Sequence, residues 1–236
     1  MSKQRIWELD ALRGLCVLGM ILIHLLYDLT DLMGVGWTYP AALLWLQDWG
    51  GVFFILISGI CATLGSRSVR RGLIVFGCGL LCSAATIGAA ALGLAGRSII
   101  IMFGILHCLG LSMLLWQPVR RLPAWVLAIL AAVIILLGLQ FEGIRMSTDL
   151  FFPLGLRSST FRSADYFPLL PFFGFFLLGA VLGKTLYRRQ PTLLPHVNTR
   201  NAAVRFLSGC GRNSLVIYLL HQPVLMGIFA ILDLLS

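Results

Sequence analysis

Long stretches of apolar residues, separated by short polar segments, run through the whole chain. Each stretch holds about 18 or more residues, which is the length an α-helix needs to cross the roughly 30 Å hydrocarbon core of a bilayer. Almost nothing is left over for a soluble domain. The pattern predicts an all-α, polytopic transmembrane helix bundle, a single domain over residues 1–236. We expect about seven spans, at residues 9–30, 41–65, 70–93, 98–117, 122–140, 166–187 and 210–235.

The composition supports a membrane protein. Of the 236 residues, 59% are hydrophobic and 11% are charged, whereas a soluble domain carries about 25% charged residues. The six cysteines lie in or beside apolar stretches, where small apolar packing residues are expected rather than disulfides. The first stretch lacks a small-residue cleavage site, so we expect a retained helix and not a signal peptide.

The net charge of +9 indicates topology rather than nucleic-acid binding, because membrane proteins concentrate Lys and Arg in their cytoplasmic loops. If the N-terminus is cytoplasmic, the seven spans leave four of the 18 basic residues outside and therefore fourteen inside. The four outer residues are Arg97, Arg145, Arg157 and Arg162. This asymmetry predicts a cytoplasmic N-terminus and an extracytoplasmic C-terminus.

The first span carries a polar stripe. Ionisable residues inside a membrane span are costly and mark a functional site by default. At 100° per residue, Arg13 and His24 lie about 20° apart around the helix and about 16 Å apart along it. Asp28 and Asp31 follow His24 at i+4 and i+7, on nearly the same face.

This stripe suits proton transfer. His24 can act as a general base or as a nucleophile near neutral pH, and Asp28 or Asp31 would orient its ring. Arg13, nearer the cytoplasm, can meet an anionic group. The structural alternative is an interhelical hydrogen bond for the histidine and a snorkelling arginine.

Five stretches of the chain resemble one family. Residues Glu8–Leu29 (ELDALRGLCVLGMILIHLLYDL) resemble the opening helix of the heparan-alpha-glucosaminide N-acetyltransferase catalytic-domain family, in its small bacterial form. They also match the Arg-x10-His pattern of the related acyltransferase-3 membrane proteins, in which both residues are functionally important. Further matches, in the same order, are WGGVFFILISG (Trp49–Gly59), FGILHCLGLS (Phe103–Ser112), DYFPLLPFFGFFLLG (Asp165–Gly179) and GRNSLVIYLLHQPVL (Gly211–Leu225).

The resemblance implies a transmembrane acyltransferase in the bacterial inner membrane. Acetyl-CoA would bind from the cytoplasm, and the acetyl group would pass to an amine or hydroxyl of an extracytoplasmic sugar or glycan. The lysosomal enzymes of the family are longer and have a large lumenal region that is lacking here, so their glycan specificity cannot be carried over. Direct transfer and a covalent acetyl-histidine intermediate both stay open.

An arginine cluster, Arg67, Arg70 and Arg71, precedes the third span. Guanidinium groups at a helix N-terminus can bind the phosphates of a nucleotide donor, and Arg67-x-x-Arg70 resembles a motif of the acyltransferase-3 proteins. A plain topology signal is the alternative reading.

Other polar residues complete the candidate site. His107 and His221 fall near the middle of the fourth and seventh spans, and with Tyr218 they could stabilise an oxyanion. No carboxylate-histidine spacing supports a metal site. Asp48 and Asp165 lie near the outer ends of spans, where they could bind the acceptor or simply be solvated. The basic inner loop at 188–209 contains Pro191 and Pro195, which discourage a continuous helix.

Two other functions use the same residues. A proton-coupled or anion transporter could relay protons or bind an anion along the stripe, and a structural protein could use it to join helices. The expected partners are the lipid bilayer, an acyl-CoA donor and a glycan acceptor. The sequence leaves open the identity of the acyl group, the choice of N- or O-transfer and whether the protein forms a homo-oligomer.

Overall fold

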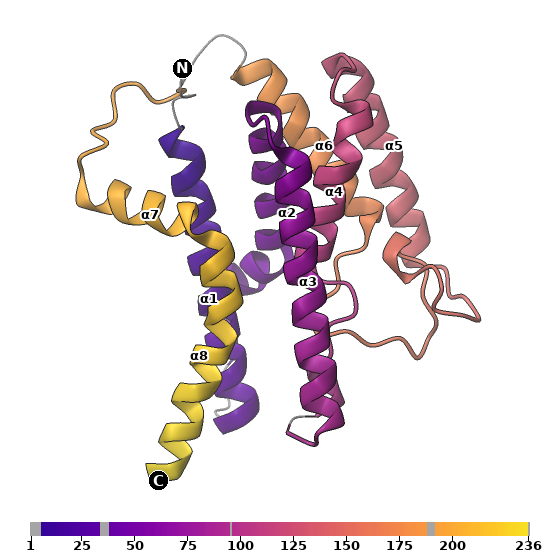
Figure 1. The fold of residues 1–236 in the computed structure, drawn as a ribbon, viewed down its shortest axis with the longest axis vertical. Coiled ribbons are helices and arrows are strands. Elements are labelled where there is room, and N and C mark those ends of the chain that lie inside the picture. Colours follow the sequence, from indigo (N-terminus) through magenta and orange to yellow (C-terminus); the bar gives the residue numbers. More distant parts are fainter. Residues whose placement is uncertain (1–5, 34–37, 95, 188–191, 236) are drawn as a thin grey trace. The chain divides into compact units, whose positions relative to one another are not determined.

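The computed structural model describes residues 6–33, 38–94, 96–187 and 192–235, with the side chains of 31–33 and 233–235 outside the description. Within these ranges the chain forms eight α-helices and two short 3₁₀ helices, with no strands (Figure 1). The α-helices are α1 (Trp7–Met33), α2 (Ala41–Leu64), α3 (Ser68–Ala91), α4 (Ile105–Val119), α5 (Ala124–Glu142), α6 (Leu169–Leu186), α7 (Ala202–Arg212) and α8 (Ser214–Leu235). The 3₁₀ helices are η1 (Arg97–Ile99) and η2 (Phe152–Leu154).

Six of the described helices are long and apolar enough to cross a membrane: α1, α2, α3, α5, α6 and α8. The seventh apolar helix, α4, is shorter, with 15 residues. The expected all-α, polytopic membrane fold is confirmed, and the chain is an integral membrane protein. The orientation of its termini stays a prediction.

The fourth span begins later than the sequence predicts. We expected it from residue 98, but α4 starts at Ile105, after η1 and an isolated bridge between Phe103 and Tyr166. The carboxylate of Asp165 accepts the backbone N–H of Ile105 and so satisfies one of the first amides of the helix. The hydrophobicity of the preceding residues continues the apolar run, but this tertiary contact fixes where the helix begins.

The basic segment before the last span contains a helix where the sequence predicts a loop. Helix α7 begins after Asn201, whose side chain accepts the N–H of Ala203 as an N-cap. Pro195 precedes this cap and does not interrupt the helix, while Pro191 lies outside the described residues. The last membrane helix, α8, therefore starts at Ser214 and not at 210.

The chain divides into two compact units, one of Met1–Phe54 with Arg189–Ser236 and one of Ile55–Arg188. In the first unit, α1 packs against α7 and α8. In the second unit, α3 packs against α4, and α6 packs against α5 and α4. The single domain expected over residues 1–236 stays a prediction.

Helices α1 and α7 touch through their backbones. A Cβ atom on Gly14 would overlap the carbonyl of Leu207, and one on Gly211 would overlap the carbonyl of Asp10. Small residues permit such close crossings between membrane helices. This crossing holds the N-terminal half of α1, which carries Arg13, against the segment that leads into α8.

Candidate functional site

Polar side chains of α1 contact polar side chains of α8 at three levels within the described residues. In order along both helices these contacts pair Arg13 with Ser214, His24 with His221, and Asp28 with Gln222. Because the order is the same on both helices, α1 and α8 run parallel. The polar stripe of the first span therefore meets a second polar face that lies about 200 residues later in the sequence.

The ring of His24 is oriented by its own helix. Its Nδ1 lies 2.9 Å from the carbonyl oxygen of Met20, one turn earlier. A carbonyl can only accept, so this contact places the hydrogen on Nδ1 and leaves the lone pair on Nε2. The backbone thus holds Nδ1 of His24, and the orienting role expected of Asp28 or Asp31 stays a prediction. His24 is exposed within the protein.

His221 has the same tautomer for the same reason. Its Nδ1 donates to the carbonyl oxygen of Tyr218. The rings of His24 and His221 lie edge to face with centroids 4.9 Å apart, and the Tyr218 ring lies 5.5 Å from that of His221. Nε2 of His221 is buried and has no hydrogen-bond partner among the described residues.

Asp28 is paired across the helix contact. It is 7% exposed, and its two carboxylate oxygens lie 3.3 and 3.1 Å from Nε2 of Gln222. An ionised carboxylate accepts and does not donate, so the amide nitrogen must face it. Oε1 of Gln222 is then directed elsewhere, and in the described part of the chain it is buried without a partner. The side chain of Asp31, the other expected orienting carboxylate, lies outside the described residues.

Arg13 occupies the other end of the stripe, about 16 Å from His24 along α1. Its Nη2 donates to the hydroxyl of Ser214 at 2.8 Å, and its guanidinium lies 5.8 Å from the ring centroid of Phe54. Nε of Arg13 is buried with no hydrogen-bond partner in the described ranges. Arg13 is therefore held in place by Ser214 while one of its donors has no partner among the described residues.

His107 belongs to the second unit and lies in the first turn of α4, not in the middle of a span. Its Nδ1 accepts the N–H of Gly104 at 3.2 Å, and its Nε2 lies 3.4 Å from the hydroxyl of Ser83. The ring stacks on Phe103 and is 3% exposed. Both ring nitrogens thus have partners, and the geometry favours helix capping over oxyanion stabilisation. The signal was present in the sequence, since His107 stands three residues after Gly104 at a helix start.

The residues that the sequence predicts near the outer ends of spans, Asp48 and Asp165, have different surroundings. Asp165 caps α4 through the 2.9 Å contact with Ile105, whereas Asp48 is exposed on α2. Tyr166 donates to the carbonyl of Phe152 at 2.7 Å, and the Arg157 guanidinium lies 5.0 Å from its ring centroid. Burial raises the pKa of Tyr166, and the charge of Arg157 opposes this shift. The contacts of Asp165 and Tyr166 organise the segment between α5 and α6.

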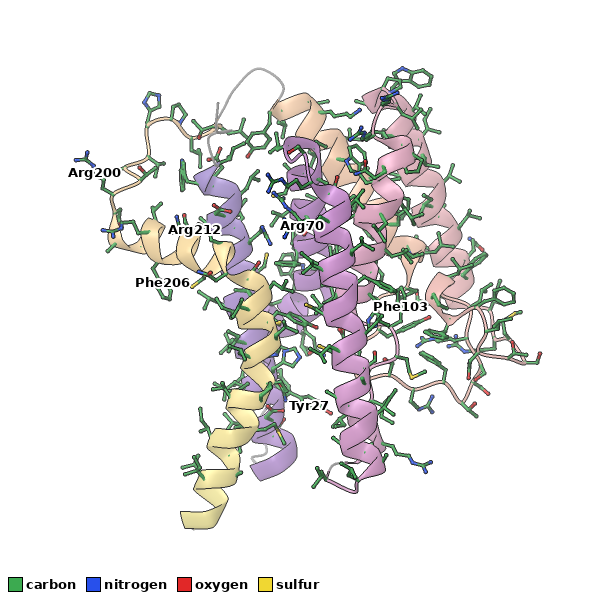
Figure 2. The ribbon with its side chains drawn as sticks, viewed as in Figure 1. Tyr27, Arg70, Phe103, Arg200, Phe206 and Arg212 are labelled. Carbon is green, nitrogen blue, oxygen red and sulfur yellow. The ribbon has the colours of Figure 1, made fainter. Side chains whose placement is uncertain are left out.

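The arginine cluster lies at the N-terminus of α3, where Arg67, Arg70 and Arg71 are all exposed (Figure 2 labels Arg70). No side chain caps this helix start, so its first amides and the three guanidinium groups are available to an anion. The same end of the second unit carries Arg121 and Lys184, beside an open cavity of about 490 Å³. Lys184 donates to the carbonyls that follow α4.

Comparison with known proteins identifies the family of the chain. A family model described as "Heparan-alpha-glucosaminide N-acetyltransferase, catalytic" matches residues 5–223. This range includes all the expected site residues, from Arg13 to His221. No curated protein and no solved structure matches the chain. Among the described residues no group of three or more His, Cys, Asp or Glu could hold a metal ion.

Proposed function

The chain belongs to the heparan-alpha-glucosaminide N-acetyltransferase catalytic family, and we propose that it transfers the acetyl group of acetyl-CoA to an amine or hydroxyl of a sugar or glycan. The observation that carries the proposal is the tautomer of His24, which the contact with the Met20 carbonyl sets. Its ring is fixed through Nδ1, and its Nε2 lone pair is left for chemistry inside a membrane helix.

His24 acts as a general base in this proposal. Its Nε2 takes the proton of the acceptor amine or hydroxyl while that nitrogen or oxygen forms a bond to the thioester carbonyl carbon. The carbon–sulfur bond breaks, and the CoA thiolate recovers the proton from Nε2. The Nδ1–H bond to Met20 stabilises the imidazolium between these steps. In the alternative route Nε2 itself attacks the thioester and carries the acetyl group, which gives ping-pong kinetics.

The donor phosphates would lie at the arginine cluster of α3. Arg67, Arg70 and Arg71 present three exposed guanidinium groups beside an uncapped helix start. In the other unit, Arg13 is held by Ser214 and offers a guanidinium of its own. We place these groups on the cytoplasmic side of a bacterial inner membrane, following the asymmetry of the basic residues. The acceptor then enters from the opposite side, where Asp48 and the segment before α6 would be reached first.

Stabilisation of the oxyanion needs a donor close to His24. The tautomer of His221 presents a lone pair at Nε2, so it can donate from this atom after protonation. The phenol of Tyr218, whose ring lies 5.5 Å from that of His221, is the other candidate on α8. We favour Tyr218, because it can donate while it is neutral.

One observation favours a second candidate function. A buried carboxylate, Asp28, and two histidines occupy consecutive levels of the α1–α8 contact. Such groups form proton relays in membrane pumps and transporters. A proton-coupled or anion transporter is therefore the alternative against which the acetyltransferase is tested.

The test uses the purified protein in detergent and in liposomes. An acetyltransferase binds radiolabelled acetyl-CoA and transfers the label to D-glucosamine, and His24→Ala abolishes transfer while acetyl-CoA binding persists. Flux of acetate or protons across liposomes that depends on His24, with no acetyl-CoA binding, would establish the transporter instead. If His24→Ala lowers the melting temperature and leaves transfer intact, His24 is structural.

A further inference from the structure

Two neighbouring residues of α8, His221 and Gln222, each have a hydrogen-bond acceptor without a partner among the described residues. Nε2 of His221 and Oε1 of Gln222 are both buried, and neither has a partner in the part of the chain that the structure describes. The tautomer of His221 and the pairing of Gln222 with Asp28 make both atoms acceptors and not donors. The α1–α8 contact thus lacks hydrogen-bond donors at two adjacent positions.

The next residue adds to this shortage of donors. Pro223 lies inside α8 and has no N–H, so the carbonyl of Leu219 lacks its usual donor four residues later. Unpaired polar atoms are costly away from water, and in a membrane span they need a partner from the protein, from water or from a ligand. Three acceptors on one turn of α8 therefore point to a group that brings several N–H or O–H bonds.

We propose that His221 and Gln222 bind the acetyl acceptor itself, by accepting hydrogen bonds from its amine and hydroxyl hydrogens. This proposal rests on the proposed acetyltransferase function. His24, in ring contact with His221, would take the proton that is lost in the transfer. The thioester end of acetyl-CoA has no N–H or O–H hydrogen, so a cluster of acceptors selects the acceptor substrate and not the reacting end of the donor.

Asp28 is a positioning residue in this scheme. Its carboxylate holds the amide nitrogen of Gln222 at 3.1 and 3.3 Å from its two oxygens. Without that carboxylate the amide of Gln222 could turn over and present N–H groups where the acceptor needs an oxygen. Asp28→Leu should then raise KM for the acceptor and leave kcat less affected.

The test compares His221→Phe and Gln222→Leu with Gln140→Leu, which makes the same change at an exposed position of α5. The probes are D-glucosamine, which has an amine and hydroxyls, and methyl glucoside, which has hydroxyls alone. We expect both α8 variants to raise KM for glucosamine at least tenfold, while the Kd of radiolabelled acetyl-CoA stays within twofold of wild type. Gln140→Leu should change neither value. Transfer to glucosamine and not to methyl glucoside would identify the amine as the acceptor.

Two outcomes overturn the proposal: an unchanged KM for glucosamine in both α8 variants, or a parallel rise in the Kd of acetyl-CoA. If Gln222→Leu does not give a monodisperse protein, Gln222→Met replaces it and keeps the length of the side chain.

Binding of glucosamine without acetyl-CoA, measured by saturation-transfer NMR, separates this proposal from the proposed function. Binding that depends on His221 and Gln222, without any transfer by wild type, supports the subsite and refutes the acetyltransferase. Transfer by wild type, with unchanged glucosamine binding in both variants, supports the acetyltransferase and refutes the subsite. The absence of glucosamine binding to wild type also overturns the subsite.

Discussion

The crossing of α1 and α7 gives a prediction whose size follows from the structure. In Gly14→Ala the new Cβ would overlap the carbonyl of Leu207 and lie 3.1 Å from the amide nitrogen of Gly211. Both obstacles are backbone atoms, so no side chain can rotate away. The two helices must separate by on the order of 1 Å, and overpacking of this kind costs about 1–3 kcal/mol.

Because the Leu207 carbonyl is a backbone atom that cannot move aside, we take the upper end of this range, about 3 kcal/mol. Alanine favours a helix over glycine by up to about 1 kcal/mol, so the expected net loss is about 2 kcal/mol. For a protein of this size each kcal/mol shifts the melting temperature by roughly 2–4 °C. We therefore expect Gly14→Ala to melt roughly 4–8 °C below wild type in a detergent-based thermal assay. Displacement of α7 also moves the start of α8, so the affinity for acetyl-CoA should fall through the Arg13–Ser214 contact.

The control is Gly227→Ala, which makes the same change on α8, where no described atom outside the local backbone lies within 4 Å of the new Cβ. It gains helix propensity at no steric cost and should melt at or slightly above the temperature of wild type. A Gly14→Ala protein as stable as Gly227→Ala would refute the close crossing of α1 and α7.

Three further predictions concern other contacts. Asp165→Ala removes the acceptor of the Ile105 amide and should cost about 1 kcal/mol, seen as a lower melting temperature with unchanged acetyl-CoA affinity. Burial raises the pKa of Tyr166, so the unfolded phenol loses its proton first and stability falls as the pH rises above about 10; Tyr166→Phe should lose this part of the alkaline decline in melting temperature. Ser214→Ala frees Arg13 and should weaken acetyl-CoA binding about threefold, and Arg13→Lys about tenfold or more because the guanidinium fork is lost. Unchanged Kd values in both would remove Arg13 from the donor site.

The membrane fold was predictable because the length of an apolar run is a strong constraint. Each long helix in the structure matches an apolar stretch of the sequence. The stripe of Arg13, His24 and Asp28 was also predictable, since residues three, four, seven and eleven apart share one helix face. Once α8 is known to be the partner helix, the stripe also predicts the order of the contacts along it.

The partners of these residues could not be predicted, because tertiary contacts decide them. Gln222 reaches Asp28 from α8, and the Met20 carbonyl accepts a hydrogen bond from a ring nitrogen of His24. Every helical residue has a carbonyl four residues before it, so the sequence gives no sign of this choice.

The missed elements had local signals that were weaker than the dominant pattern. Asn201 is a typical N-cap and marks the start of α7, but the prolines and basic residues around it favoured a loop. His107 lies three residues after the glycine that starts α4, but the continuous apolar run placed it mid-span. At α7 composition and at α4 the apolar run outweighed the local signal that marks the start of the helix.

The role of His24 is tested most directly by a substitution that keeps its contact and removes its base. In His24→Asn the side-chain amide can still donate to the Met20 carbonyl, as Nδ1 does now, but there is no atom equivalent to Nε2. We predict wild-type melting temperature and acetyl-CoA affinity, and a single-turnover rate of acetyl transfer to glucosamine that falls by about 10²–10⁴, the usual contribution of a general base. A rate within tenfold of wild type, in a protein that binds acetyl-CoA normally, would contradict the assignment of His24 as the base.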